Sequence, residues 1–540
     1  MAKADPTDAP AGASEATSRQ AGRGVLFIAA AKLYFMVIGL FIQLRLPAIL
    51  SHATFGAYSV VNSVVSPLNN VMVTGSIQAV SRFTAQTDAA RAAQAAGLRM
   101  HLVVGVPVAL AFAAAAPLIA WAFGDGDKAA PIALAALIVG GYAFYAVFVG
   151  AANGRRQFHK QAGLDMLFAT LRAVAILGAA GAGLGVIGVI GGWVAAVVGI
   201  LVVAALWVGL PGKVAPAERQ PIGPMVRFFA GVALYLALFN ALMFVDTWLL
   251  KAQTASHFAD AGARLPGALV GGASWLSALG DYRPAPAALA DVQVAYYAAA
   301  QNLARLSYQA IIAATFVVFP LVSKSTFSDD RDTTRTYVQV TARYSLIFAT
   351  AIGVAMAANP GPILDVVYPT DYAVLGGPAL AALAIGNVAF SLFAIGGTIL
   401  NGAGYTRDAI LTAGATLALA AIGNLVAIPM AEPGRQALAV AASVTGASMV
   451  VGAVLTGVVL HRRLGAFLPL ASVARVVLAV GVAWAVGALL PSGGALVTLA
   501  EAAITAIVFL AVLVASRELG RRDLAAISAV RKKRGQGVEA

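Results

Sequence analysis

Residues 187–209 read IGVIGGWVAAVVGILVVAALWVG, an apolar run without a single charged side chain. The hydrocarbon core of a bilayer is about 30 Å thick, and an α-helix of roughly 20 apolar residues crosses it. This run is therefore expected to span a membrane. The same pattern recurs along the chain and predicts an all-α polytopic membrane protein with about fourteen spans.

The predicted spans are joined by short, turn-like segments, which are typical of antiparallel neighbours. They cover residues 25–46, 56–80, 100–123, 130–152, 164–184, 187–209, 226–250, 293–322, 339–358, 376–400, 409–429, 437–460, 469–490 and 496–515. The Ala-, Ser-, Thr- and Pro-rich residues 1–23 are expected to form a disordered cytoplasmic N-terminus. No cleaved leader is expected, because the apolar run that follows is too long for a signal peptide.

The composition agrees with a bilayer environment and excludes several kinds of site. Hydrophobic residues make up 60% of the chain and charged residues 11%, whereas soluble domains carry about 25% charged residues. The absence of cysteine excludes disulfides and thiolate metal sites. No metal site is predicted from the five scattered histidines, and no GxxxxGK[ST] loop indicates that ATP drives the chain directly.

The net charge of +13 is explained by topology. If the N-terminus is cytoplasmic, 27 of the 36 Lys and Arg residues fall in cytoplasmic segments and five in outer loops. This asymmetry is the positive-inside pattern of an inner-membrane protein with both termini in the cytoplasm. It makes a nucleic-acid partner unnecessary. The basic residues of 516–540 then form a cytoplasmic tail next to membrane lipids.

Two halves of the chain echo each other. The second span ends in Ala79-Val80-Ser81-Arg82, and the eighth span ends in Leu321-Val322-Ser323-Lys324, 242 residues later. The fourth span ends in Asn153-Gly154, and the tenth span ends in Asn401-Gly402, 248 residues later. This repeat predicts two six-helix lobes in parallel orientation, residues 24–210 and 226–460. The second lobe would contain an outer loop, 251–292, and residues 468–515 would add two helices.

Ionisable residues inside spans usually face a cavity or a partner, because lipid does not solvate them. Lys32 lies within the first span, and Arg305 lies in the eighth with Asn302 and Gln309 on the same face. Asn62 and Asn69 form a similar stripe in the second span. We expect these stripes to meet in a hydrated cationic cavity that binds an anionic headgroup. Arg45 and Arg82, near opposite ends of their spans, are further candidates for contact with that substrate.

A structural explanation competes with this reading, since such residues also snorkel to the interface or bond neighbouring helices. Asp165 and Arg172 lie on one face of the fifth span and are predicted to neutralise each other as an internal pair. Asp246 and Glu501 are the other acids near or within spans. They are the candidates for H⁺ or Na⁺ coupling, and no other cofactor is expected.

The segment Phe55-Gly56-Ala57-Tyr58, followed by Ala79-Val80-Ser81-Arg82-Phe83, resembles the opening of oligosaccharide flippases. These are the Wzx-type and stage-V-sporulation-B-like proteins of the multidrug/oligosaccharidyl-lipid/polysaccharide exporter superfamily. Phe319-Pro320-Leu321-Val322-Ser323 and residues 399–407 resemble the second-half signatures, so the likeness covers about residues 25–460. It implies two lobes, alternating access and export of a polyprenyl-diphosphate-linked oligosaccharide. The polysaccharide polymerase machinery would be a further partner.

Two other functions are compatible with a polytopic membrane protein. A cation-coupled multidrug exporter of the same superfamily would line its cavity with acids, whereas the deep charges here are mainly basic. A membrane glycosyltransferase or polymerase would need carboxylates or histidines poised at the membrane face. The loop 251–292 contains acids and a histidine but no paired-acid spacing. The sequence therefore favours a transporter over an enzyme.

Overall fold

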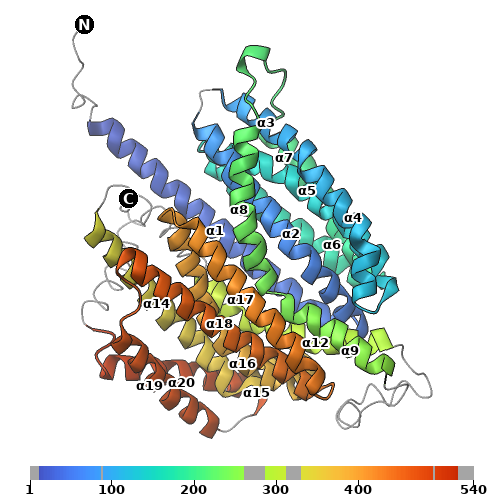
Figure 1. Ribbon diagram of the computed structural model, residues 1–540, viewed down its shortest axis with the longest axis vertical. Coiled ribbons are helices and arrows are strands. Elements are labelled where there is room, and N and C mark those ends of the chain that lie inside the picture. Colours follow the sequence, from blue (N-terminus) through green and yellow to red (C-terminus); the bar gives the residue numbers. More distant parts are fainter. Residues whose placement is uncertain (1–10, 87–88, 261–285, 312–329, 491–492, 521–540) are drawn as a thin grey trace. The chain divides into compact units, whose positions relative to one another are not determined.

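The computed structural model describes residues 11–86, 89–260, 286–311, 330–490 and 493–520, and these residues are predominantly helical (Figure 1). The chain forms two compact units. Unit 1 comprises residues 1–244 together with 287–295, and unit 2 comprises 245–286 and 296–540.

Unit 1 contains eight complete helices within its described residues. They are α1 (Ala11–Ile49), α2 (His52–Ala85), α3 (Ala90–Val103), α4 (Gly105–Ala122), α5 (Ala129–Gly154), α6 (Phe158–Gly181), α7 (Gly185–Val208) and α8 (Gly223–Leu242), with the short 3-10 helices η1 (Gly126–Lys128) and η2 (Pro216–Glu218). Helix α5 packs on α2, α4 and α7, and α6 packs on α1 and α7. Residues 287–295 of helix α12 (Pro286–Ala304) also belong to this unit, and the rest of α12 belongs to unit 2.

Unit 2 is built around the pair α16 (Thr370–Gly402) and α18 (Arg435–Leu464). Its other described helices are α9 (Val245–Asp260), α14 (Arg331–Ala358), α15 (Pro360–Val367), α17 (Thr406–Ala427), α19 (Leu470–Leu489) and α20 (Gly494–Ala515), with the 3-10 helix η3 (Ile428–Met430). Helices α19 and α20 pack on each other and on α14.

Twelve of the predicted spans correspond to described helices that are long and apolar enough to cross a membrane. This confirms the all-α polytopic class, while the count of fourteen is not confirmed. The two remaining predicted spans, 56–80 and 293–322, fall on α2 and on α12 with the residues after it, and residues 312–322 lie outside the described part. Helix α2 has 34 residues, and at 1.5 Å per residue it is long enough to cross a bilayer.

Several element boundaries differ from those expected from the sequence. Helix α1 begins at Ala11, inside the segment expected to be disordered, and its Ala-rich start favours helix. The predicted span 226–250 is divided between α8 and α9 by a turn at Met243 and Phe244. Helix α8, expected to open the second lobe, belongs to unit 1. There it packs on α2 through a 2.7 Å hydrogen bond from Asn70 Nδ2 to Asn240 Oδ1.

Glycine residues allow close helix crossings in both units. A Cβ atom at Gly154 of α5 would lie 2.7 Å from the carbonyl oxygen of Ser81 in α2. At this crossing Ser81 Oγ donates to Asn153 Oδ1 at 3.0 Å. In unit 2, a Cβ atom at Gly386 would lie 2.6 Å from Gly446 Cα, so α16 and α18 also meet through small residues. The echoed motif of the first half is therefore a packing contact. Its second-half counterpart, residues 321–324, lies outside the described residues.

Candidate functional site

The first polar cluster within the membrane helices joins α1, α5 and α6 of unit 1. Lys32 Nζ lies 2.8 Å from Asp165 Oδ2, and the Lys32 side chain is 34% exposed while that of Asp165 is 8% exposed. Tyr145 Oη donates to Asp165 Oδ1 at 3.5 Å. Lys32 and Asp165 therefore neutralise each other, and the lysine side chain stays partly exposed.

This arrangement corrects the predicted internal pair, because Asp165 is paired with Lys32 and not with Arg172. Asp165 and Arg172 share a face of α6, but seven residues of helix separate them by about 10 Å along the axis. Helix α1 packs alongside α6 and brings Lys32 much closer.

Arg172 is instead surrounded by aromatic rings. Its guanidinium carbon lies 5.0 Å from the ring centroid of Phe35, 6.0 Å from that of Phe168 and 5.9 Å from that of Trp193. Such cation–π contacts hold a guanidinium group without cancelling its charge. Within the described residues Arg172 forms no ion pair. The group formed by Lys32, Asp165 and Arg172 therefore carries a net charge of +1.

The second polar cluster lies in unit 2 around Asp246, which is 1% exposed. Tyr297 Oη donates to Asp246 Oδ2 at 2.7 Å, and Gln301 Nε2 lies 3.0 Å from both carboxylate oxygens. The backbone N–H of Thr247 donates to Oδ1 at 2.7 Å. Arg305 Nη2 in turn donates to Gln301 Oε1 at 3.3 Å. Gln301 thus links the predicted substrate-binding base to the predicted coupling acid, a role that its position in the sequence does not indicate.

The other residues predicted to bind substrate do not belong to these two clusters. Arg45 is exposed, and the exposed Arg82 lies over the ring of Phe228 in α8, with its guanidinium carbon 4.8 Å from the centroid. Asn62 accepts a 2.9 Å hydrogen bond from Ser66 within α2, whereas Asn69 is buried and its amide has no hydrogen-bond partner among the described residues.

Asn302 and Gln309 are half-buried in unit 2. Because α2 and residues 296–311 belong to different units, the expectation that their polar stripes meet stays a prediction.

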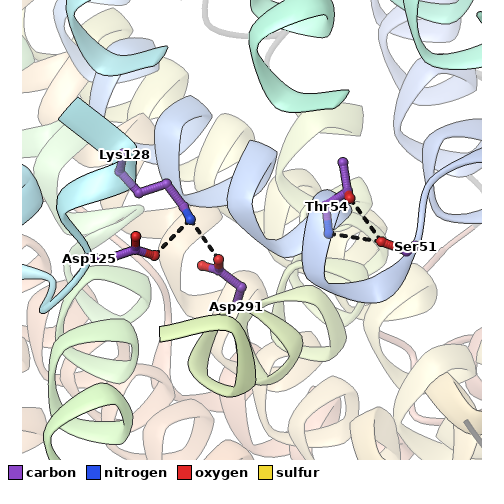
Figure 2. A network of polar contacts seen from close by, with 5 residues as sticks. All are labelled: Ser51, Thr54, Asp125, Lys128 and Asp291. Carbon is purple, nitrogen blue, oxygen red and sulfur yellow. Dashed lines mark hydrogen bonds and ion pairs between the residues drawn. The ribbon is translucent and has the colours of Figure 1, made fainter. Parts of the chain in front are cut away.

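A third cluster was not anticipated from the sequence. Lys128 Nζ lies 2.7 Å from both Asp125 Oδ2 and Asp291 Oδ2, and all three residues are at most 7% exposed (Figure 2). Beside it, Ser51 caps α2 by accepting the backbone N–H of Thr54 at 3.3 Å. The sequence places Asp125 and Lys128 in one short joint, but it gives no signal that Asp291, far along the chain, completes the triad. No group of three or more His, Asp or Glu residues suited to a metal ion occurs in the described parts of the chain.

Comparisons with solved structures place this arrangement among known transporters. The lipid II flippase MurJ in an inward closed conformation superposes with a TM-score of 0.69 at 12% identity, over 92% of this chain and 99% of that one. An inward-facing multidrug resistance MATE family transporter of the MOP superfamily gives 0.56 at 15% identity, over 82% and 98%. The chain has the fold of these transporters.

Further comparisons agree with this fold. A MOP superfamily transporter from Pyrococcus furiosus, described as having a binding pocket of reverse polarity, gives a TM-score of 0.56 at 13% identity over 82% of this chain and 95% of that one. A family model described as polysaccharide biosynthesis protein matches residues 46–247. No curated protein sequence matches this chain significantly. The fold that the sequence motifs indicate is thus confirmed, and the chain is a multi-pass membrane protein with the architecture of a flippase or transporter.

Proposed function

We propose that the protein is a flippase that moves a polyprenyl-diphosphate-linked oligosaccharide from the cytoplasmic to the outer leaflet by alternating access. The observation that carries this proposal is the guanidinium of Arg172 inside the helices of unit 1, which lies against three aromatic rings and forms no ion pair among the described residues. A diphosphate is a ligand suited to such a group, because guanidinium binds phosphate oxygens through two parallel hydrogen bonds.

Lys32 would add a second contact to the same headgroup. Its side chain is one-third exposed beside Asp165, and in the proposed mechanism a phosphate oxygen would approach the lysine from this exposed side. The same charges disfavour the multidrug exporter, because a cavity that attracts organic cations should carry net negative charge. In unit 1, Asp165, which shares a face of α6 with Arg172, is already neutralised by Lys32.

The proposal includes the orientation and location expected from the loop charges. Both termini would be cytoplasmic in the inner membrane, and the glycolipid would be handed to the polysaccharide polymerase machinery. The polyprenyl chain would remain in lipid while the diphosphate and the glycan pass through the protein.

The test is a flipping assay in proteoliposomes that contain purified protein and a fluorescent polyprenyl-diphosphate saccharide. A membrane-impermeant reductant quenches the fluorophore only in the outer leaflet, so the quenched fraction reports flipping. Arg172→Gln should slow flipping at least about tenfold, the value of one lost charged contact of about 1.4 kcal/mol or more. Arg172→Lys should retain part of the rate. Arg435→Gln, which removes an exposed arginine at the start of α18, is the matched control.

Unchanged flipping by Arg172→Gln would refute the role of this guanidinium. Transport of an organic cation, without any flipping of the glycolipid by the wild-type protein, would refute the proposed substrate class.

A further inference from the structure

The face of α20 that is buried in unit 2 is unusual for a membrane helix, because three of its five buried residues are polar. Thr498, Glu501 and Thr505 are all at most 3% exposed, and they follow one another at helical spacing. The opposite face presents Leu496, Leu499 and Ile507, which are each more than half exposed. This pattern suits a helix whose outer face contacts lipid and whose inner face surrounds a polar site.

Two oxygen atoms on that inner face are buried without hydrogen-bond partners in the described structure, Glu501 Oε1 and Thr505 Oγ1. The other carboxylate oxygen of Glu501 lies 3.4 Å from Asn359 Nδ2. No Lys, Arg or His of the described residues forms an ion pair with Glu501. A buried carboxylate costs several kcal/mol unless a positive charge accompanies it. An ionised Glu501 therefore needs a cation that the described residues do not supply.

Two helices end beside this carboxylate. Asn359 directly follows the last residue of α14, and its Nδ2 also donates to the carbonyl of Gly487, in the last turn of α19, at 2.9 Å. A Cβ atom at Gly487 would lie 2.7 Å from Thr505 Oγ1 and 2.8 Å from Ala358 Cβ, so the two helix ends and α20 are in close contact. Helix C-termini carry partial negative charge and leave carbonyl groups without partners inside the helix. Both properties favour a bound cation.

We propose that Glu501 and Thr505, at the C-terminal ends of α14 and α19, form a binding site for a monovalent alkali cation. One positive charge neutralises the one carboxylate, whereas a divalent ion would leave a net charge in apolar surroundings. Carboxylate, hydroxyl and carbonyl oxygens are hard ligands that suit such a cation, and broken or terminating helices supply them in membrane transporters. The inference does not depend on the proposed flipping of a glycolipid.

The experiment measures thermal unfolding of the purified protein in detergent, without glycolipid, as NaCl replaces N-methyl-D-glucamine chloride at constant ionic strength. A ligand that binds only the folded state raises the Tm in a saturable manner. The wild-type protein should show this saturable rise, Glu501→Gln should lose it, and Thr505→Val should need at least about tenfold more Na⁺ to reach it. Thr456→Val is the matched control, because it also removes a buried hydroxyl without a partner in the described residues, but on α18.

The same titration with KCl identifies which alkali cation binds. A saturable rise with either salt that Glu501→Gln abolishes supports the site. Equal changes of Tm in all three salts, or a Na⁺ response that both variants retain, would overturn it. If Glu501→Gln does not fold, Thr505→Val and direct binding of ²²Na⁺ to the wild-type protein decide the question. A wild-type protein that binds no alkali cation but still flips the glycolipid would overturn this inference and leave the proposed function intact.

Discussion

Replacement of Lys128 should be among the most destabilising single changes in unit 1. Its amine lies 2.7 Å from both Asp125 and Asp291 in a buried environment (Figure 2). Coulomb's law with an effective dielectric constant of about 20 gives roughly 6 kcal/mol of attraction for each contact at this distance. The desolvation of three charges offsets much of that attraction. Removing the central charge, however, leaves two buried carboxylates side by side without the counter-charge that they share.

We therefore expect Lys128→Met to lower the free energy of unfolding by about 3–5 kcal/mol, the range for loss of one partner from a buried ion pair. Asp125→Asn should be much milder, because Lys128 and Asp291 then remain as a neutral pair. Adding Asp291→Asn and Asp125→Asn to Lys128→Met should recover much of the loss, since no buried charge remains.

The measurement is unfolding in mixed detergent micelles, followed by far-ultraviolet circular dichroism. The reasoning fails if Lys128→Met unfolds within about 1 kcal/mol of the wild-type protein. It also fails if Asp125→Asn costs as much as Lys128→Met, because that result would mean that packing, and not charge balance, stabilises this corner.

Two further predictions concern packing and pH. A Cβ atom at Gly56 would lie 1.7 Å from the carbonyl oxygen of Asp291, so Gly56→Ala should force α2 and α12 apart and cost about 1–3 kcal/mol in the same assay. Gly178→Ala, in an open position within α6, should be neutral or stabilising, and equal effects of the two substitutions would contradict the contact. Glu518 accepts hydrogen bonds from Arg343 Nε at 2.7 Å and Arg475 Nη1 at 2.9 Å. Although burial opposes its ionisation, these bonds hold the pKa of Glu518 below its ordinary value of 4.5. Ionised Glu518 should therefore contribute about 1.5 kcal/mol to the free energy of unfolding, the value for hydrogen bonds to charged groups. This contribution should be complete above about pH 4.5 and should disappear as the pH falls through the lowered pKa. Glu518→Gln should lack it at all pH values. A wild-type advantage over Glu518→Gln that persists unchanged at pH 3 in thermal unfolding would refute this interpretation.

The apolar pattern predicted most of the fold because a membrane helix must satisfy its own backbone and present apolar side chains to lipid. Both constraints are local, so a window of about 20 residues detects them. Helix α2, predicted as the span 56–80, fits that pattern less well than the other spans because its Asn and Ser side chains lower its hydropathy, although its length suits a span. The position of a polar helix in the fold depends on the helices that pack against it, and a hydropathy window along one segment does not include those helices. The same limit applies to α8, which belongs to unit 1 and whose Asn240 accepts a hydrogen bond there from Asn70 of α2.

Pairings between helices were the least predictable part of the candidate site. From one sequence, the geometry along a single helix is known, and it suggested Asp165 and Arg172 as partners. The actual partner of Asp165 is Lys32, which comes from α1. Spacing within one segment cannot reveal such a contact. Arg305 and Asp246 were both recognised as charges in apolar surroundings, but their connection through Gln301 depends on how α9 and α12 approach each other.

The motifs that carry the family resemblance are mainly packing residues, which explains why they indicate the fold better than the substrate. Gly56 lets the backbone of α12 pass α2 at Asp291, and Ser81 bonds Asn153 where Gly154 allows α2 and α5 to cross. Gly56, Ser81 and Gly154 carry no charge, and the base of the first-half motif, Arg82, is exposed and lies over the ring of Phe228. Arg172, whose charge favours an anionic headgroup, lies outside every one of these motifs. Packing residues belong to the architecture, whereas the proposed recognition of a headgroup would depend on a few charges placed on it. For this chain, discrimination between a diphosphate glycolipid and an organic cation should therefore depend on Arg172 and its aromatic surroundings.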